Sequence, residues 1–224
     1  TNILFSNLVN SINSWYVNAC VDNPPPIFDS EKEGDDIDLD FDNSEDAFTA
    51  LQSWRVKNSN RIALGSLNIN SLPNKIDGLR TLITNNIDVL VVQETKIDST
   101  FTNESIAIPG YVHKPFRRDR KLGGGGIVTY IREDIPSKLL TSFTIPDDIE
   151  GTFIELNLRK AKWLIFATYL PPWQNKSYFL ETLSKALDVY RAKYDNIILV
   201  GDFNTKDIEE VLCDFNFDPG VELF

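Results

Sequence analysis

The sequence predicts an α/β (α+β) protein in which layers of β-sheet are covered by helices. Two mainly apolar runs, at 87–92 and 196–200, are typical of strands that are buried on both faces. The run at 153–158 instead alternates apolar and polar residues, as a strand with one exposed face does. Apolar residues recur at helical spacing over 72–83. Helices and mixed strands in this order favour sheets flanked by helices.

From Arg61 onward the elements can be placed one after another. Helices are expected over 72–83 and 179–190, where the apolar positions fall on one face. Strands are expected at 62–67, 87–92, 126–131, 153–158, 163–169 and 196–200. A short turn separates 153–158 from 163–169, so we expect these two strands to pair.

Residues 1–60 are expected to be an acidic, proline-containing leader that is largely disordered, ahead of a domain at 61–224. Residues 29–46 hold ten acidic side chains against Lys32, which is −9 of the chain's net charge of −11. Such charged blocks are usually solvated. We interpret the run as a linker, and an acidic mimic of nucleic acid covering a basic groove is the alternative. A short amphipathic helix is expected at 47–54.

The composition favours an intracellular protein. No apolar stretch is long enough to span a bilayer, and the start has neither the basic nor the apolar region of a signal peptide, so secretion is not expected. Cys20 and Cys213 lie in unrelated segments, which favours reduced thiols. The chain begins at Thr1 and has no methionine, so we expect a fragment at its N-terminal end.

Polar side chains follow the two most apolar strands. Strand 196–200 leads through a glycine to Asp202 and Asn204, and residues two apart in a strand point to the same side. Strand 87–92 leads directly to Glu94. Carboxylate and amide oxygens at such strand ends can hold a hard metal ion, a water nucleophile or a phosphate oxygen. The two strand ends therefore predict a metal-dependent phosphoesterase site.

Four motifs follow one another in a fixed order that resembles the endonuclease/exonuclease/phosphatase superfamily. They are Leu67-Asn68-Ile69-Asn70, Gln93-Glu94-Thr95-Lys96, Ala167-Thr168-Tyr169-Leu170-Pro171-Pro172 and Gly201-Asp202-Phe203-Asn204-Thr205. The resemblance covers about residues 61–210. Within the superfamily the chain is most similar to the apurinic-type endonuclease domain of non-LTR (LINE-type) retrotransposons, because of Leu-Asn-Ile-Asn-Ser-Leu, Gln-Glu-Thr-Lys and the glycines 123–126 before Ile-Val-Thr-Tyr-Ile. The resemblance implies a four-layer sandwich of two mixed β-sheets flanked by helices, incomplete here at the C-terminus.

The resemblance also implies a role for each residue of the site. Glu94 would bind a divalent metal, Mg²⁺ or alternatively Mn²⁺, and Asn68 would orient the ligands of that metal. Asp202 would orient or deprotonate the attacking water, Asn204 would donate to the phosphate, and Tyr169 would contact the scissile phosphate. Each residue type also has a structural use, such as turn hydrogen bonds for asparagine and aspartate. Their joint appearance favours catalysis.

A basic segment precedes the glycines. This segment, residues 114–121, has five basic side chains against Asp119, which is a local charge of +4. We expect it to contact DNA phosphates without reading bases. A solvated hairpin arm is the alternative. The expected DNA-contacting residues are Arg117, Arg118, Arg120 and Lys121. The glycines at 123–126 fit neither a P-loop nor a dinucleotide fingerprint, and we interpret them as a flexible hairpin tip.

Later segments of the family's site, an aspartate and a Ser-Asp-His type motif, have no match before Phe224, and the sole histidine, His113, matches no catalytic position. Asn70 stands where many relatives carry aspartate, which would weaken metal binding. We therefore expect the chain to leave a sheet face and an edge uncovered, to fold incompletely and to have negligible nuclease activity by itself.

The resulting prediction is the Mg²⁺-dependent, DNA-nicking endonuclease domain of a retrotransposon-derived protein, with DNA as partner, no membrane partner and a nuclear location. Two alternatives stay open. One is another phosphoesterase of the superfamily, acting on abasic sites, RNA, inositol phosphates or sphingomyelin. The other is a non-catalytic binding module. The oligomeric state and the target sequence are not predicted.

Overall fold

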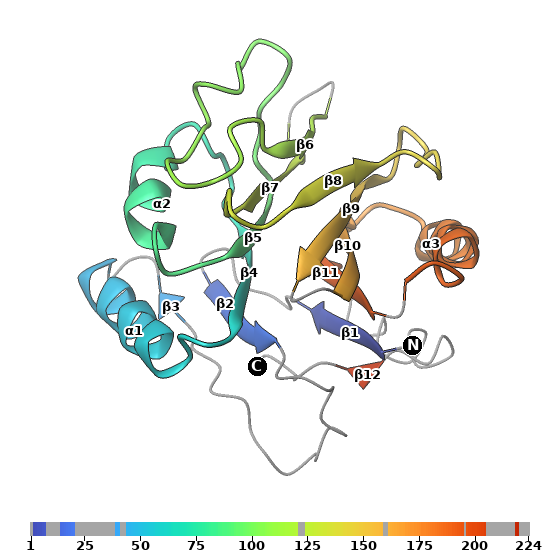
Figure 1. Cartoon of the computed structure of the whole chain (residues 1–224). Coiled ribbons are helices and arrows are strands. Elements are labelled where there is room, and N and C mark those ends of the chain that lie inside the picture. The colour runs from blue at the N-terminus through green and yellow to red at the C-terminus, as the bar shows by residue number, and fades with distance from the viewer. Residues whose placement is uncertain are drawn as a thin grey trace.

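The structure is a computed structural model that describes residues 2–7, 14–20, 39–40, 44–120, 124–158, 161–194, 196–204 and 218–219. It contains two mixed β-sheets packed face to face with helices outside them, which confirms the expected α+β sandwich (Figure 1). The expectation that the sandwich is incomplete at its C-terminus stays a prediction, because most residues after 204 lie outside the described part.

Each sheet has six strands among the described residues. The first runs in the order β12 (Asp218–Pro219), β1 (Asn2–Asn7), β11 (Asn196–Asp202), β10 (Ala161–Tyr169), β9 (Glu150–Leu158) and β8 (Ser137–Leu140). The second runs in the order β3 (Leu39–Asp40), β2 (Ser14–Cys20), β4 (Ile62–Asn68), β5 (Val89–Gln93), β7 (Ile127–Ile131) and β6 (Phe116–Arg118). The expected pairing of 153–158 with 163–169 is confirmed as the antiparallel pair β9 and β10.

Three apolar layers explain why the central strands are apolar at consecutive positions. In β5, Val89 and Val91 pack between the two sheets, while Leu90 and Val92 pack under the helices of the second sheet. The same alternation divides β11 between the inter-sheet core and the core under helix α3 (Lys176–Tyr190). Both faces of these strands are therefore buried, and each fully buried aliphatic side chain contributes roughly 1.5–3 kcal/mol.

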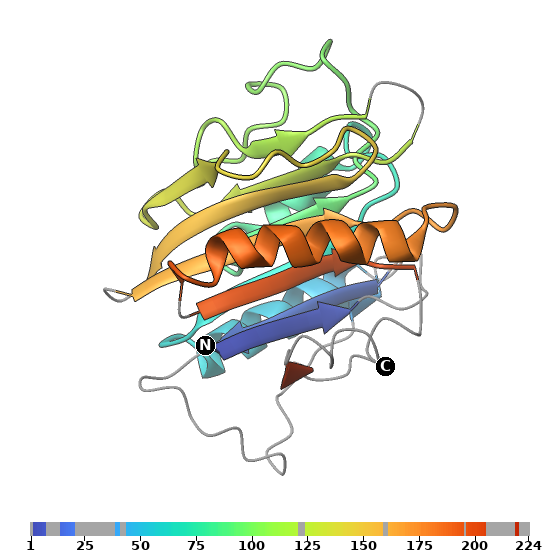
Figure 2. The same cartoon turned by 90° about the vertical axis from the view of Figure 1, so that its right-hand side faces the viewer.

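Helices α2 (Ile76–Ile83) and α3 cover opposite outer faces of the sandwich. Helix α3 lies along the outer face of the sheet that contains β10 and β11 (Figure 2), and Asn175 caps its start by accepting a hydrogen bond from the backbone N–H of Tyr178 at 3.1 Å. Helix α2 begins later than the expected residue 72. The backbone at Asn70 and Ser71 has positive φ, so Leu72 enters the core from a turn instead of from the helix.

The described part of the leader belongs to the same body. Strand β1 pairs in parallel with β11, and β2 pairs antiparallel with β4. The expected helix at 47–54 is confirmed as α1 (Ser44–Lys57), which buries Leu51 and Trp54 against the core under α2. The edges of β11 and β4 are thus paired with leader strands, and the expectation that missing later segments leave a sheet face and an edge uncovered stays a prediction. Disorder in the rest of the leader stays a prediction, since residues 21–38 lie outside the described part.

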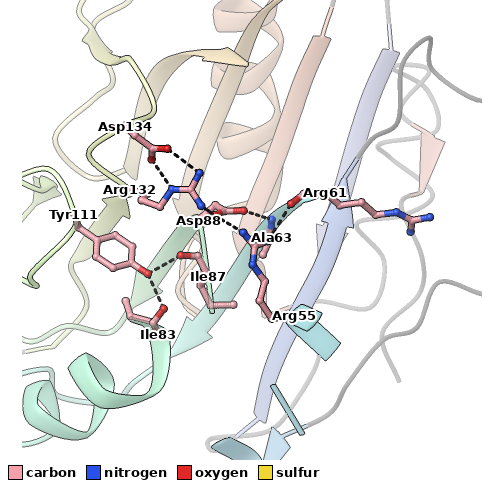
Figure 3. A network of polar contacts seen from close by, with 9 residues as sticks. All are labelled: Arg55, Arg61, Ala63, Ile83, Ile87, Asp88, Tyr111, Arg132 and Asp134. Carbon is pink, nitrogen blue, oxygen red and sulfur yellow. Dashed lines mark hydrogen bonds and ion pairs between the residues drawn. The ribbon is translucent and has the colours of Figure 1, made fainter. Parts of the chain in front are cut away.

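A buried carboxylate ties α1 to the second sheet (Figure 3). Asp88 is 1% exposed and accepts hydrogen bonds from Arg55 at 3.1 Å, from Arg132, and from the backbone N–H of Ala63 at 2.7 Å. Arg55 comes from α1, Arg132 follows β7 and Ala63 lies in β4. Pairing with two guanidinium groups and a backbone donor offsets the cost of burying the charge.

No helix among the described residues is long and apolar enough to cross a membrane.

Candidate active site

The polar residues expected from the sequence meet at one edge of the sandwich. Asn68 ends β4 and Glu94 follows β5 in one sheet, while Tyr169 ends β10 and Asp202 ends β11 in the other. Strands β4 and β5 are parallel to each other, as are β10 and β11, and β11 also contacts β4 and β5 across the inter-sheet core (Figure 1). The four strand ends therefore bring side chains from both sheets together.

Asn68 is the centre of this cluster. Its Nδ2 donates to Glu94 Oε1 at 3.1 Å and to Asp202 Oδ2 at 3.0 Å. Its Oδ1 accepts from the backbone N–H of Asn70 at 3.2 Å, which fixes the carboxamide with the amino group toward the two carboxylates. The neutral amide of Asn68 thus holds the two carboxylates side by side. A carboxylate in place of this amide would repel both of them.

Tyr169 contacts the same acidic pair. Its hydroxyl donates to Glu94 Oε1 at 2.7 Å and its ring is buried. Burial, and then the hydrogen bond to Glu94, raise the pKa of Tyr169 far above its ordinary value, so the phenol stays protonated and remains a donor. The contact with a scissile phosphate that the resemblance implies stays a prediction.

Asp202 is buried at the end of β11. Burial raises the pKa of Asp202, hydrogen bonds from Asn68 and Asn204 oppose that rise, and the charge of Glu94 adds to it. The backbone N–H of Asn204 donates to Asp202 Oδ1 at 3.0 Å, so the Asx turn considered from the sequence is present together with the contact to Asn68. Asn204 Nδ2 donates to Leu170 O at 3.1 Å, and its expected contact with phosphate stays a prediction.

The backbone around the cluster adopts conformations that side chains other than glycine rarely take. Most of the non-glycine residues with positive φ belong to the segments of the site: Asn70, Ser71, Glu94, Lys96 and Asn204. Left-handed residues cost roughly 1–3 kcal/mol each and persist where surrounding structure imposes them. Here the Glu94 carbonyl accepts from Ser71 N at 2.8 Å and the Lys96 N–H donates to Gly125 O at 2.9 Å, so neighbouring loops hold Glu94 in place.

Gly201 is required by the close approach of β10 and β11. Its φ is +155°, and a Cβ atom added there would lie 1.8 Å from Thr168 O. The glycine in the Gly-Asp-Phe-Asn motif therefore lets β11 deliver Asp202 beside Tyr169, with which it is paired in register.

Glu150 is a buried acidic neighbour that sequence reasoning missed. It begins β9, pairs in register with Tyr169, accepts from the backbone N–H of Gly126 and forms an ion pair with Arg120. Burial raises the pKa of Glu150, the Gly126 N–H and Arg120 oppose the rise, and Glu94 adds to it. Its sequence signal was weak, because one acidic residue at the start of a half-exposed strand is usually solvated.

Gly125 and Gly126 pack closely, which corrects the interpretation of a flexible tip for these two glycines, while flexibility at Gly123 and Gly124 stays a prediction. A Cβ at Gly125 would lie 2.6 Å from Glu150 Oε1, and one at Gly126 would lie 2.6 Å from Thr95 Oγ1. Both positions have positive φ. These glycines therefore allow the loop to fit against the carboxylate of Glu150; Gly123 lies outside the described residues.

The basic segment is held to the protein surface by its own arginines. Arg117 forms an ion pair with Asp119. It also donates to the carbonyl of Phe101 at 2.9 Å and to the carbonyl of Asp98 at 2.8 Å. Arg118 donates to Pro146 O at 2.6 Å.

Arg120 pairs with Glu150 and lies over the ring of Trp173. The expected DNA contacts of these arginines stay predictions, and Lys121 lies outside the described residues. His113 is exposed, 3.8 Å from Glu104, in keeping with a surface residue.

The donor set suits a hard divalent cation. Glu94 and Asp202 are joined through one amide, and within the described ranges neither forms an ion pair with lysine or arginine. Those ranges also contain no group of three or more His, Cys, Asp or Glu residues arranged for a metal. A site with one carboxylate ligand and several waters is the kind that Mg²⁺ accepts.

A two-sheet sandwich with carboxylate and amide groups gathered at its strand ends has the architecture of a phosphoester hydrolase. The chain belongs to the Endonuclease/Exonuclease/phosphatase family, whose profile matches residues 65–221. Members of this family are hydrolytic nucleases and phosphatases that depend on a divalent metal, typically Mg²⁺.

Several solved structures are similar to this chain. The AP endonuclease LMAP from Leishmania major is 17% identical, with 61% of this chain and 53% of that chain covered and a TM-score of 0.48. The endonuclease domain of TRAS1, a telomere-specific non-LTR retrotransposon, is 16% identical, with 65% and 60% covered and a TM-score of 0.46. TDP2 of D. rerio, complexed with single strand DNA product, is 17% identical, with 70% and 66% covered and a TM-score of 0.49. The chain thus spans between about half and two thirds of these proteins. No curated protein matches the chain.

Proposed function

We propose that this chain carries the catalytic centre of a Mg²⁺-dependent endonuclease that nicks DNA, in a retrotransposon-derived protein. The observation that carries the hydrolytic part is the bridge that Asn68 forms between Glu94 and Asp202. Membership of a family of hydrolytic nucleases and phosphatases supports it. The retrotransposon part rests on the sequence motifs at 67–72, 93–96 and 123–131, and a nuclear location would follow from it.

The residues divide the reaction between them. A divalent cation held by Glu94, with Asn68 beside it, would neutralise negative charge on the phosphoryl oxygens. Asp202 would accept a proton from the attacking water, and burial, which raises its pKa, would make it a stronger base than an exposed aspartate. The water oxygen would then bond to phosphorus while the P–O3′ bond breaks. The departing O3′ would take a proton from solvent and Asp202 would release its proton to solvent, which leaves a 3′-hydroxyl and a 5′-phosphate.

Tyr169 supplies a hydrogen bond to the same centre. Its protonated phenol donates to Glu94 in the free protein and can turn to a phosphoryl oxygen when DNA is bound. Asn204 keeps Asp202 in place through its backbone N–H, so the base is oriented before substrate arrives. Such preorganised donors are a large source of rate enhancement, because they need no rearrangement during the reaction.

Metal binding is the first test, because it does not depend on turnover. Calorimetric titration with Mg²⁺ and Mn²⁺ should give a single site, and Glu94→Gln should weaken it at least tenfold, since the substitution removes the charged ligand. Glu104→Gln is the matched control, because Glu104 is an exposed acid away from the cluster. Equal metal affinity in wild type and Glu94→Gln would leave a non-catalytic binding module as the better interpretation.

Substrate choice is the second test. Supercoiled plasmid, abasic oligonucleotide and small phosphoesters would be compared in the presence of Mg²⁺, with this chain and with the chain continued downstream in its parent reading frame. The nicking rate of this chain by itself is expected to be low. Nicking of intact plasmid that Asp202→Ala reduces roughly 10²–10⁴-fold would support the endonuclease. Turnover confined to abasic DNA or small phosphoesters would favour another activity of the family.

A further inference from the structure

Trp173 is a large, solvent-exposed aromatic side chain in the loop between β10, which ends at Tyr169, and α3. It is 67% exposed, while Trp54 and Trp163 are buried. It follows Tyr169 by four residues, so at most about 14 Å of extended chain separates the two. The loop is fixed on both sides, because Leu170 N donates to Asp202 O at 2.8 Å and Gln174 N donates to Pro171 O at 3.0 Å.

A cation is placed on one face of this indole. The Arg120 guanidinium carbon lies 5.2 Å from the ring centre of Trp173, within the range of a cation–π contact. The same guanidinium forms the ion pair with Glu150, whose strand is in register with Tyr169. The ring is therefore joined through Arg120 and Glu150 to the strand that pairs with Tyr169.

We propose that Trp173, backed by Arg120, stacks on a nucleobase of the DNA strand next to the scissile phosphate. The inference rests on the proposed function and adds a substrate contact to it. An exposed indole offers an apolar face to a base, and the Arg120 guanidinium packed on the ring supports it from the other side. Neighbouring bases follow at 3.4 Å per step along a strand, so the loop lies within reach of the first few nucleotides beside the cleaved bond.

This arrangement favours an unstacked base. Inside a regular duplex both faces of a base are covered, whereas a single-stranded or displaced nucleotide presents a free face. The contact would be tolerant of sequence, because every base has such a face. Trp173 would thus distinguish flexible or opened DNA from rigid duplex, while the phosphate contacts position the backbone.

The test measures binding of short fluorescent DNA to the full chain with Mg²⁺ replaced by Ca²⁺. Trp173→Ala should weaken binding of single-stranded DNA roughly 5–100-fold, as loss of one stacked base does, and Trp173→Phe should retain most of the affinity. Val56→Ala is the control, because Val56 is an exposed apolar residue on α1. 2-Aminopurine placed at successive positions should be quenched at one of them by wild type and not by Trp173→Ala.

The outcomes separate this inference from the proposed function. If wild type binds DNA while Trp173→Ala, with an unchanged melting temperature, binds equally well and quenches the same 2-aminopurine, the stacking contact is wrong and the endonuclease proposal stands. If wild type does not bind DNA in any form, the proposed function itself fails, and the inference with it. If Trp173→Ala and Trp173→Phe lose the same affinity for DNA, the aromatic ring is not the source of the contact, and the stacking inference is overturned.

Discussion

Removal of the Asp88 carboxylate should be among the most damaging single changes outside the candidate site. Asp88→Ala leaves the backbone N–H of Ala63 without its acceptor, 2.7 Å away in the native protein, which costs about 1–3 kcal/mol. It also leaves Arg55 and Arg132 without their shared anion. These side chains are 17% and 36% exposed, so water can replace part of the lost contact. We therefore expect a loss of about 3–5 kcal/mol in the free energy of unfolding, the range for breaking a buried pair.

Urea unfolding followed by circular dichroism measures this loss, and thermal melting offers a second readout. At roughly 2–4 °C per kcal/mol for a chain of this size, the midpoint should fall by about 6–20 °C. Asp77→Ala is the control, because Asp77 is 90% exposed and pairs with Arg80 in its own helix, so its change should stay within about 0.5 kcal/mol. A loss below 1 kcal/mol for Asp88→Ala would refute the reasoning.

A double-mutant cycle extends the same measurement to α1. Arg55 lies in the leader, and its contact with Asp88 at 3.1 Å is what joins that helix to the buried carboxylate. If α1 is docked as described, Arg55→Ala should cost much less in an Asp88→Ala background than in wild type, with a coupling of roughly 0.5–3 kcal/mol. Additive losses would mean that the two residues do not interact in solution.

The remaining predictions concern the site. Asp202→Asn should raise the melting temperature at pH 7 in the presence of a chelator. Because burial raises the pKa of Asp202, the stability contributed by its protonated form is present below the unfolded-state pKa and is lost as pH rises through the folded-state pKa. The gain in melting temperature from Asp202→Asn should therefore vanish below about pH 4. An equal melting temperature for both proteins across the pH range would contradict this. Gly201→Ala should prevent native folding or cost several kcal/mol, because its Cβ would lie 1.8 Å from Thr168 O. Gly78→Ala, in α2 with nothing within 4 Å of the added Cβ, should instead stabilise by about 0.5–1 kcal/mol in the same denaturation assay.

The central strands and the meeting of the site residues were predictable from local pattern. Consecutive apolar residues such as Val91 and Val92 indicate a strand buried on both faces, and the two residues do pack into different cores. Because such strands run in parallel within each sheet, the polar groups that follow them come to one edge. The positions of Glu94 and Asp202 follow from this rule.

Other features depended on contacts distant in sequence. The left-handed backbone at Glu94 is imposed by hydrogen bonds to loops around Ser71 and Gly125, and glutamate has no preference for it. Glu150 became a buried neighbour of the site because β9 pairs with β10, which a single acidic residue does not reveal. The strands at 2–7 and 14–20 were obscured by the acidic run that follows them, although each contains a short apolar stretch.

The pairing of β1 with β11 sets the order in which the protein can be assembled on the ribosome. Asn2 lies 194 positions before its partner Asn196, so β1 leaves the ribosome well before β11 is synthesised. At 5–20 residues per second, β1 waits roughly 10–40 s for the strand that it pairs with. During that time its free edges can pair with other chains. Overexpression should therefore yield aggregates, and a chaperone that shields nascent strands should reduce them.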